Sequence, residues 1–287
     1  MEPVAGQVAG QAGAVSDEPV GGPEVLYERD GHVATVTLNR PHRRNAISTR
    51  MLSELAETLE AAEADSTVRA VVLTGAGKGF CAGLDIKDAL SGSGIGSEAS
   101  RSGWSTVGAL RTRHLPTVVL AQMDTPVIAA VNGAAAGYGF DLALGCDIRI
   151  VGSSSVLMPG FAKRGVVPES GGTWYLPRLV GWAKAAEIGF LGRDIDAAAA
   201  CDIGLANLAV VDDDLLDVAH EWAAEIAANA PLAVQAMKRL FRHGLSEDFE
   251  SHTHHVLLQT MQLFSTSDFR EGITAFAERR SANFEGR

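Results

Sequence analysis

Two glycine-rich segments carry the residues whose types and spacing could do chemistry. They are GAGKGFCAGLDI at 75–86 and NGAAAGYGFDLALGCD at 132–147, and each directly follows a short apolar run. Glycine permits a positive φ and places no Cβ between the backbone and a ligand, so main-chain N–H groups in such turns can approach a substrate closely. In the second segment the amides also begin a helix, whose partial positive charge favours a developing anion. Two such donors that converge on one point would form an oxyanion hole.

Each of these turns, taken alone, also fits a plain connection between a strand and a helix of an α/β protein. Neither is a P-loop, because no Gly-Lys pair followed by Ser or Thr occurs in them. Neither has the GxGxxG spacing of a dinucleotide-binding turn that opens a helix. The presence of both turns in one chain favours a catalytic use of their backbone amides.

Two other features have residue types of functional sites, and we interpret them otherwise. The segment HTHH contains His252, His254 and His255, but residues two positions apart on a helix point in different directions. We therefore predict solvated or interface histidines and no metal site. Ser170, in ESGG, lacks the GxSxG setting of a hydrolase nucleophile and an evident histidine partner.

Hydrophobic periodicity predicts the elements that position the two turns. Residues 33–40 alternate between apolar and polar side chains, as in a half-buried strand, and Pro41 ends the run. Ser48 can cap the helix that follows, in which apolar residues recur every three or four positions. Residues 69–75 form a continuous apolar run of the kind found in parallel strands covered on both faces.

The same alternation continues along the chain and is typical of an α/β fold in which helices connect layers of sheet. The further elements that we expect are strands at 126–133, 146–152 and 205–211, and helices at about 107–123 and around 141–144, with a loop at 91–100. From residue 214 onward the periodicity is helical only. The predicted organisation is a disordered tail at 1–23, a core with the site at 24–213 and a helical region at 214–287.

The composition agrees with an enzyme that has a large core and no general affinity for polyanions. The chain has 287 residues, of which 46% are hydrophobic, so it can bury more than a short binding module can. Its formal net charge of −11 gives no attraction to nucleic acid or to anionic membranes. No apolar run of about 18 residues and no signal-like start occur, so we expect a cytoplasmic protein. Three widely spaced cysteines outside CxxC pairs favour free thiols.

Three blocks of the sequence closely resemble the signature blocks of the enoyl-CoA hydratase/isomerase, or crotonase, family. They are GFCAGLDI, NGAAAGYGFDLALGCDIRI and VVPESGGTWYLPRLVG, in the family's order and at its separations, within a resemblance that extends from about Val25 to Phe284. The resemblance implies a crotonase-like ββα spiral with a parallel two-sheet core and a C-terminal helical trimerisation region. It also implies a homotrimer or a dimer of trimers, a coenzyme A thioester as substrate, no permanently bound cofactor and no metal.

The resemblance assigns catalytic roles by position. The backbone N–H groups of Leu84 and Tyr138 would bind the thioester oxygen, and Asp141 would be the first of the two acids of a hydratase. The second acid is expected in PGFAKRG, where this chain has Gly160. Glu169 stands where some isomerases of the family carry an acid, so Asp141 and Glu169 resemble the proton-shuttling pair of dienoyl-CoA isomerases. Asp141 could instead be a negative charge at a helix N-terminus that interacts favourably with the helix dipole, and Glu169 could cap the glycine turn that follows it.

Substrate-binding residues are also implied by the resemblance. Those of the CoA part are Arg43, Ala82, Asp85, Ile86 and Lys87, together with Phe276 and Arg279 near the C-terminus, which would reach a CoA site that is often the neighbour's. Those of the acyl pocket are Phe80, Met158, Phe161 and Trp174. For the three basic residues of the first set a solvated surface position is the alternative, and for the acyl-pocket set a plain role in the hydrophobic core.

The function expected from the resemblance is an enoyl-CoA isomerase or hydratase that acts on unsaturated fatty acyl-CoA through a thioester enolate. The absence of glutamate at position 160 favours isomerisation, because an isomerase moves a proton between two carbons and activates no water. Thioester hydrolysis and C–C bond cleavage are alternatives that use the same enolate. A non-catalytic RNA-binding or scaffold role is an alternative of another class, and the net charge of −11 argues against RNA.

Overall fold

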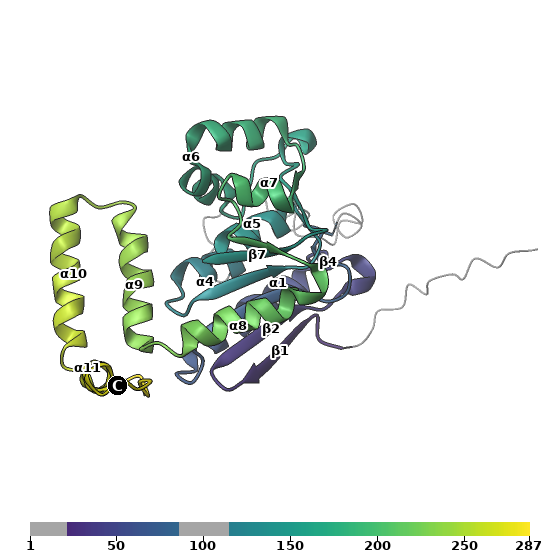
Figure 1. Cartoon of the computed structure of the whole chain (residues 1–287). Coiled ribbons are helices and arrows are strands. Elements are labelled where there is room, and N and C mark those ends of the chain that lie inside the picture. Colours follow the sequence, from purple (N-terminus) through teal and green to yellow (C-terminus); the bar gives the residue numbers. More distant parts are fainter. Residues whose placement is uncertain (1–21, 86–114) are drawn as a thin grey trace, which may run out of the picture.

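The apolar runs of the sequence form the strands of a large sheet. The structure is a computed structural model that describes residues 22–85 and 115–287. Within these residues six strands pair in the order β1-β2-β3-β5-β7-β10, and Figure 1 shows β1 and β2 side by side at one edge. Their bounds are Val25–Asp30 for β1, Val33–Leu38 for β2, Ala70–Gly75 for β3, Val127–Val131 for β5, Ile148–Gly152 for β7 and Leu208–Val210 for β10. Pairing is parallel except in the β1–β2 hairpin.

The central strands are apolar throughout because helices cover both faces of the large sheet. On β3, Val71 and Leu73 contact the cluster that includes α1 (Thr49–Ala64), whereas Ala70 and Val72 belong to the cluster with α8 (Leu215–Ala227). All six residues of β3 are buried, as expected for a parallel strand between two layers. Ser48 caps α1 as predicted, because its hydroxyl accepts a hydrogen bond of 3.0 Å from the Met51 amide.

A second, smaller sheet is formed by the short strands that follow the strands of the first. In the described part of the chain its order is β4-β6-β8-β9, with β4 at Gly79–Cys81, β6 at Ala134–Ala136, β8 at Val156–Met158 and β9 at Ile195–Asp196. Because β4, β6 and β8 follow β3, β5 and β7, the chain repeats a strand–turn–strand unit. The predicted α/β spiral with two sheets is confirmed, but its sheets are mixed, since β1–β2 and β8–β9 are antiparallel.

Helices follow the short strands and carry the candidate site. They are α4 (Pro116–Gln122), α5 (Tyr138–Gly145), α6 (Gly172–Leu191) and α7 (Ala197–Asp202), with 3-10 turns at Pro41–Arg43, Ala162–Arg164 and Asp212–Asp214. Of the helix predicted at 107–123, only the part from residue 115 lies within the described residues, where α4 is found. The predicted loop at 91–100 and residues 1–21 of the predicted tail lie outside them.

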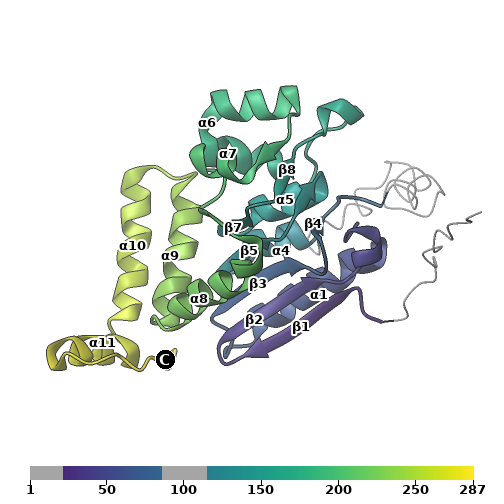
Figure 2. The ribbon, with the colours of Figure 1, turned by 45° about the vertical axis from the view of Figure 1, so that its right-hand side comes forward.

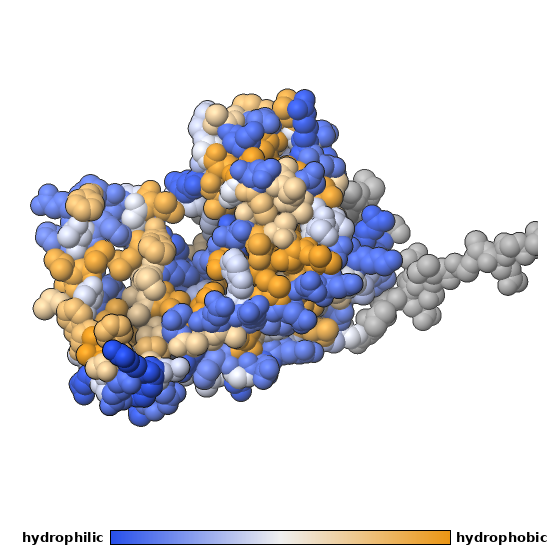
Figure 3. Space-filling view, in the orientation of Figure 1, coloured by the Kyte–Doolittle hydropathy of each residue, from blue (hydrophilic) through white to orange (hydrophobic). Residues whose placement is uncertain are grey.

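The C-terminal residues are helical, as the periodicity predicted. Helix α8 packs on the large sheet, whereas α9 (Pro231–Gly244) and α10 (Phe249–Leu263) lie side by side away from it, and α11 (Ser267–Glu278) lies at their end (Figures 1 and 2). Figure 3 shows many apolar side chains on the surface of these last helices. Among the residues that the structure describes, no helix has the length and apolarity needed to cross a membrane.

Candidate active site

The two glycine-rich turns lie against each other because β4 and β6 are neighbours in the small sheet. Their pairing is parallel, with Gly79 opposite Ala134 and Cys81 opposite Ala135, so the segments that follow both strands leave the sheet at the same edge. Gly83 has φ +90, and a Cβ there would lie 2.8 Å from the Ala136 carbonyl oxygen and 3.5 Å from the Tyr138 nitrogen. Glycine therefore allows the backbone before Leu84 to contact the backbone before Tyr138.

The amides of Leu84 and Tyr138 have no acceptor within the described residues. Beside Leu84, Ile47 pairs with its two neighbours: the Ile47 amide donates to the Gly83 carbonyl at 2.8 Å, and the Asp85 amide donates to the Ile47 carbonyl at 3.0 Å. Tyr138 begins α5, and the first amides of a helix have no acceptor inside it. Both N–H groups predicted for the oxyanion hole are thus unoccupied by main-chain bonding in residues 22–85 and 115–287.

Asp141 is a fully buried carboxyl group in the first turn of α5. Its exposed fraction is 0%, its Oδ2 accepts a hydrogen bond of 3.0 Å from the Ser170 amide, and its Oδ1 lies against Gly172 at the start of α6. Burial raises the pKa of Asp141 to about 7; the Ser170 and Gly172 amides oppose this effect and the Glu169 carboxylate adds to it. A carboxyl group that titrates near neutral pH can both accept and return a proton.

Gly172 at the start of α6 is required for the burial of Asp141. A Cβ on Gly172 would overlap Asp141 Oδ1 and would lie 2.8 Å from the Pro168 Cβ. The segment 159–171, which joins β8 to α6, therefore closes over Asp141 at its far end. The same segment presents Glu169, which is exposed but close enough to Asp141 and to the Tyr138 phenol to raise the pKa of each.

The side chain of Tyr138 is a feature that the sequence interpretation did not use. Only 5% of the residue is exposed, and its hydroxyl lies beside the Thr117 side chain. Burial raises the pKa of the phenol above its ordinary value; the neighbouring Cys81, Asp141 and Glu169 side chains raise it further, and the Thr117 side chain lowers it. Tyr138 therefore brings a neutral phenol as well as a free amide to the site.

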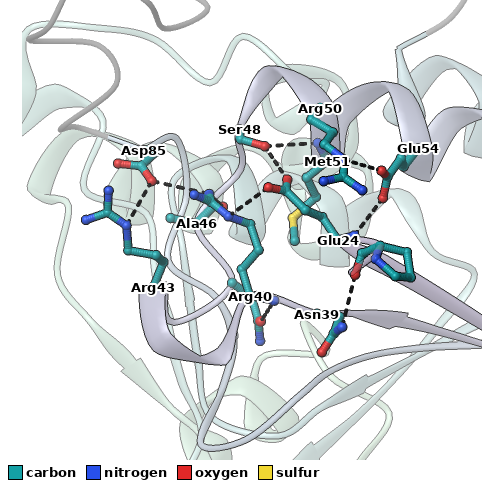
Figure 4. A network of polar contacts seen from close by, with 12 residues as sticks. Glu24, Asn39, Arg40, Arg43, Ala46, Ser48, Arg50, Met51, Glu54 and Asp85 are labelled. Atoms are coloured by element: carbon teal, nitrogen blue, oxygen red, sulfur yellow. Dashed lines mark hydrogen bonds and ion pairs between the residues drawn. The ribbon is translucent and has the colours of Figure 1, made fainter. Parts of the chain in front are cut away.

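Buried ion pairs anchor the first turn. Asp85 accepts from Arg40 Nη1 at 3.2 Å and lies 3.6 Å from Arg43 Nε, and Figure 4 shows both guanidinium groups pointing to its carboxylate. Asp85 directly follows Leu84, so this contact fixes the backbone of Leu84. Asp85 and Arg43, both predicted to contact CoA, are thus engaged with each other in the chain as it stands.

Arg149 supports the second turn, and the sequence interpretation did not include it. Its guanidinium is buried and donates to the carbonyl oxygens of Cys146 at 2.6 Å and of Leu205 at 2.7 Å. A cation at the C-terminal end of α5 complements the partial negative charge of its carbonyl groups. The signal available in the sequence was one arginine inside the apolar strand segment CDIRIVG.

The other predicted binding residues lie in varied places. Ala82 is exposed, and its amide donates to the Arg44 carbonyl at 3.0 Å. Phe276 has an exposed fraction of 86%, and Arg279 is exposed at the end of α11, away from the two glycine turns (Figure 1). Ile86 and Lys87 lie outside the described residues.

The four predicted acyl-pocket residues also differ in exposure. Phe80 and Phe161 are buried in the hydrophobic core. Met158 is half-buried at the end of β8, where its carbonyl accepts from the Gly137 amide at 3.2 Å. Trp174 is exposed on α6, with the Arg178 guanidinium carbon 3.2 Å from the centre of its ring. Only Met158 has a hydrogen bond to the turn that precedes Tyr138.

The described residues also line a cavity of about 760 Å³ far from these groups, between β1, β2, α8 and the C-terminal residues. Three of its polar side chains already have partners: His220 bonds Thr35 at 2.9 Å, and Arg69 donates to the Phe284 carbonyl at 2.8 Å. None of the predicted site residues lines it. The histidines of HTHH form no metal-binding group within the described residues; His252 and His255 lie instead beside Glu247.

The chain is similar to known proteins over most of its length. A family model described as enoyl-CoA hydratase/isomerase matches residues 28–287. The short-chain-enoyl-CoA hydratase of Clostridium acetobutylicum is 37% identical over 89% of this chain and 95% of its own length, and the 1,2-epoxyphenylacetyl-CoA isomerase of Escherichia coli is 36% identical over 92% and 98%. The crystal structure of an enoyl-CoA hydratase from Bacillus anthracis is similar with a TM-score of 0.84 and 34% identity, covering 92% of this chain and 100% of that one.

Proposed function

Since the chain belongs to the enoyl-CoA hydratase/isomerase family and is an enzyme of that family, we propose that it shifts a double bond in unsaturated fatty acyl-CoA esters. Members of this family act on CoA thioesters without a metal. One observation carries the proposal: two unoccupied backbone amides lie on glycine turns in mutual contact, with a buried carboxyl group of pKa about 7 in the helix that begins at one of them.

In the proposed reaction a carboxylate takes a proton from the carbon next to the thioester. The electron pair of that C–H bond moves toward the thioester oxygen, which becomes an enolate and accepts hydrogen bonds from the Leu84 and Tyr138 amides. A proton is then returned at the carbon two positions further along the chain, and the double bond moves into conjugation. Preorganised N–H donors are typically worth a factor of about 10²–10³ each in such sites.

Asp141 and Glu169 are the groups proposed to move the proton. Asp141 titrates near neutral pH, so both of its protonation states are populated during turnover. The Glu169 carboxylate lies close enough to Asp141 to raise its pKa further, as a smaller cause beside burial. Two neighbouring carboxyl groups can remove a proton from one carbon of the acyl chain and return a proton to another.

Isomerisation is favoured over hydration because position 160, where the second acid of a hydratase is implied, holds glycine. Hydration needs one acid to activate water and another to help protonate the α-carbon. Asp141 and Glu169 could act as these two acids only if Glu169 reaches the water. Thioester hydrolysis and C–C bond cleavage share the enolate and are the other reactions to be separated.

The assay that tests the proposal follows the purified enzyme spectrophotometrically with 3-enoyl-, 2-enoyl- and dienoyl-CoA of equal chain length. We expect conversion of the 3-enoyl or dienoyl ester to its conjugated isomer, with hydration of the 2-enoyl ester slower by at least about tenfold. Faster hydration than isomerisation would assign the enzyme as a hydratase. Release of free CoA without a change in the double bond would indicate hydrolysis.

We also propose that the enzyme works as a trimer or a dimer of trimers. Apolar side chains on α9, α10 and α11 have large exposed fractions in the single chain, among them Phe241 at 72%, Phe249 at 86% and Phe276 at 86%. A surface of this kind marks a contact with another protein surface. In such an assembly Phe276 and Arg279 would approach a neighbour's CoA. A cytoplasmic location likewise stays a prediction.

A further inference from the structure

The side chain of Arg164 fills the space where residue 160 lacks a side chain. Arg164 ends the 3-10 turn Ala162–Arg164, and its Nη1 donates a hydrogen bond of 3.0 Å to the Gly160 carbonyl. A Cβ on Gly160 would overlap Arg164 Nη1, and it would lie 3.5 Å from the guanidinium carbon and 3.9 Å from Nη2. At the position where the resemblance implies a carboxylate, the chain therefore places a cation.

This cation belongs to the segment that closes over the catalytic groups. Segment 159–171 is bound at both ends to the start of α5: the Met158 carbonyl accepts from the Gly137 amide at 3.2 Å, and the Ser170 amide donates to Asp141 at 3.0 Å. Gly160 is buried and follows Met158 by two residues, a chain length of at most about 7 Å. Arg164 is exposed, and its hydrogen bond to Gly160 holds the guanidinium on the part of this segment that follows Met158, next to the turn before Tyr138.

Arg164 is free to bind a ligand. Within the described residues it makes no ion pair, and its one hydrogen bond uses one of the five N–H donors of a guanidinium. The planar fork of donors matches a carboxylate better than any other common acyl substituent. Asp141 and Glu169 would repel an anionic acyl group, so a site that accepts one needs a cation close to them.

We propose that Arg164 is a specificity-determining residue that binds a carboxylate on the acyl chain, so that the preferred substrates are CoA esters of short unsaturated dicarboxylic acids. This inference rests on the proposed function, because it places the acyl chain between the two backbone amides and segment 159–171. Glycine at position 160 has no Cβ, so the Arg164 guanidinium can occupy the space beside it. Lys163, the preceding cation, packs its aliphatic chain 3.5 Å from where a Cβ on Gly192 would lie, so it offers a matched control for Arg164.

The test compares two esters of equal length, 3-hexenedioyl-CoA and 3-hexenoyl-CoA, in the wild type, Arg164→Met and Lys163→Met. We expect the wild type to have a kcat/KM about tenfold or more higher for the dicarboxylic ester, as one charge-assisted hydrogen bond allows. Arg164→Met should lose this preference and keep its kcat/KM for 3-hexenoyl-CoA within about twofold. Lys163→Met should keep the preference. A preference that survives Arg164→Met, or a wild type that prefers the neutral ester, overturns the proposal.

Binding of unreactive esters separates recognition from chemistry. Saturated adipoyl-CoA and hexanoyl-CoA cannot isomerise, and at equal concentration the ester that binds more tightly raises the melting temperature of the enzyme more. We expect a larger shift with adipoyl-CoA in the wild type and equal shifts in Arg164→Met. If this difference is found while no ester is turned over, the proposed reaction fails and the role of Arg164 stands. An equal loss of affinity for both esters in Arg164→Met would show that Arg164 binds the CoA part and would contradict the inference.

Discussion

Helix α5 and helix α10 differ most in how far their own chain buries them. Every residue of α5 from Tyr138 to Leu144 is buried, whereas α10 has no buried residue along its 15 positions. Other parts of the chain also hydrogen-bond to α5. Arg149 donates to the Cys146 carbonyl at its C-terminal end, and the Ser170 amide donates to Asp141 in its first turn. At its other end α5 begins with the Tyr138 amide, which has no acceptor within the described residues, and carries Asp141 in its first turn.

The helices beyond α8 are attached to the core mainly through charged contacts. Lys238 of α9 lies 2.7 Å from Asp147, and Arg239 lies 3.1 Å from Asp124. Partly exposed ion pairs contribute only about 0–1 kcal/mol each, so these contacts position α9 without stabilising it strongly. The difference teaches that the chain by itself buries the helix with the proposed catalytic groups, whereas it leaves the apolar side chains of its last helices exposed. The predictions below separate these two properties.

Asp141→Asn should have the largest effect on activity and almost none on assembly. Asparagine keeps the size of the side chain but cannot accept the substrate proton, so we expect kcat to fall by about 10²–10⁴. Steady-state kinetics with the preferred ester measure this fall, and the native mass is the control. Retention of more than a tenth of the wild-type kcat would assign proton removal to another group, and the burial of α5 would then have no catalytic meaning that α10 lacks.

Tyr138→Pro tests the backbone amide separately from the side chain. Tyr138 is the first residue of α5, where proline is well tolerated because its missing N–H has no intrahelical acceptor. We expect kcat to fall by about 10²–10³, the usual cost of one oxyanion donor. Tyr138→Phe is the matched control: it keeps the amide and the buried ring and removes only the hydroxyl, so its kcat should stay within about threefold. Equal losses in the two variants would assign the role to the phenol.

The stability of the enzyme should depend on pH through Asp141. Its pKa is about 7 in the folded state and 3.8 when unperturbed, so the folded state binds more protons between these values. Stability from this group is therefore complete below about pH 4 and is lost as the pH rises through about 7. Asp141→Asn, which carries no charge, should be more stable than the wild type at pH 8 by about 2–4 kcal/mol. Urea unfolding at pH 5 and pH 8 measures this gain, which should shrink at the lower pH; an equal gain at both would reject the linkage.

The sequence predicted the parts of the fold that depend on hydrophobic period. The strands at 33–40 and 69–75 and the helix capped by Ser48 were predicted, because a buried strand and an amphipathic helix each leave a clear pattern. The strands of the small sheet were not, since β4 and β6 are three residues each within glycine-rich segments and were interpreted as turns. Such strands form because neighbouring backbones meet, which no local pattern encodes.

The candidate site was predicted unevenly for a similar reason. Asp141 and the two turns follow from motifs, and the structure brings Leu84, Tyr138, Asp141 and Glu169 to adjoining segments. The contacts of Arg149 with α5 and of Arg164 with Gly160 depend on how a long side chain folds back over the backbone. A long, flexible side chain has many rotamers, so its final contact follows from the tertiary structure and not from its position in a motif.

The smallest expected effect concerns α10. Leu258, with an exposed fraction of 61%, has little contact with its own chain, so Leu258→Lys should leave the helical content and the fold of a single chain unchanged. If α9, α10 and α11 are covered by another copy, the buried lysine should lower the native mass measured by light scattering and make the melting temperature a few degrees lower. Leu216→Lys on α8, where the exposed fraction is 42%, is the matched control and should keep the native mass.

Activity of Leu258→Lys should fall only as far as the neighbour's Phe276 and Arg279 contribute to CoA binding, seen as a higher KM at unchanged kcat. A wild type that is already monomeric at assay concentrations would remove the need for a covering surface and leave α10 as an exposed helix.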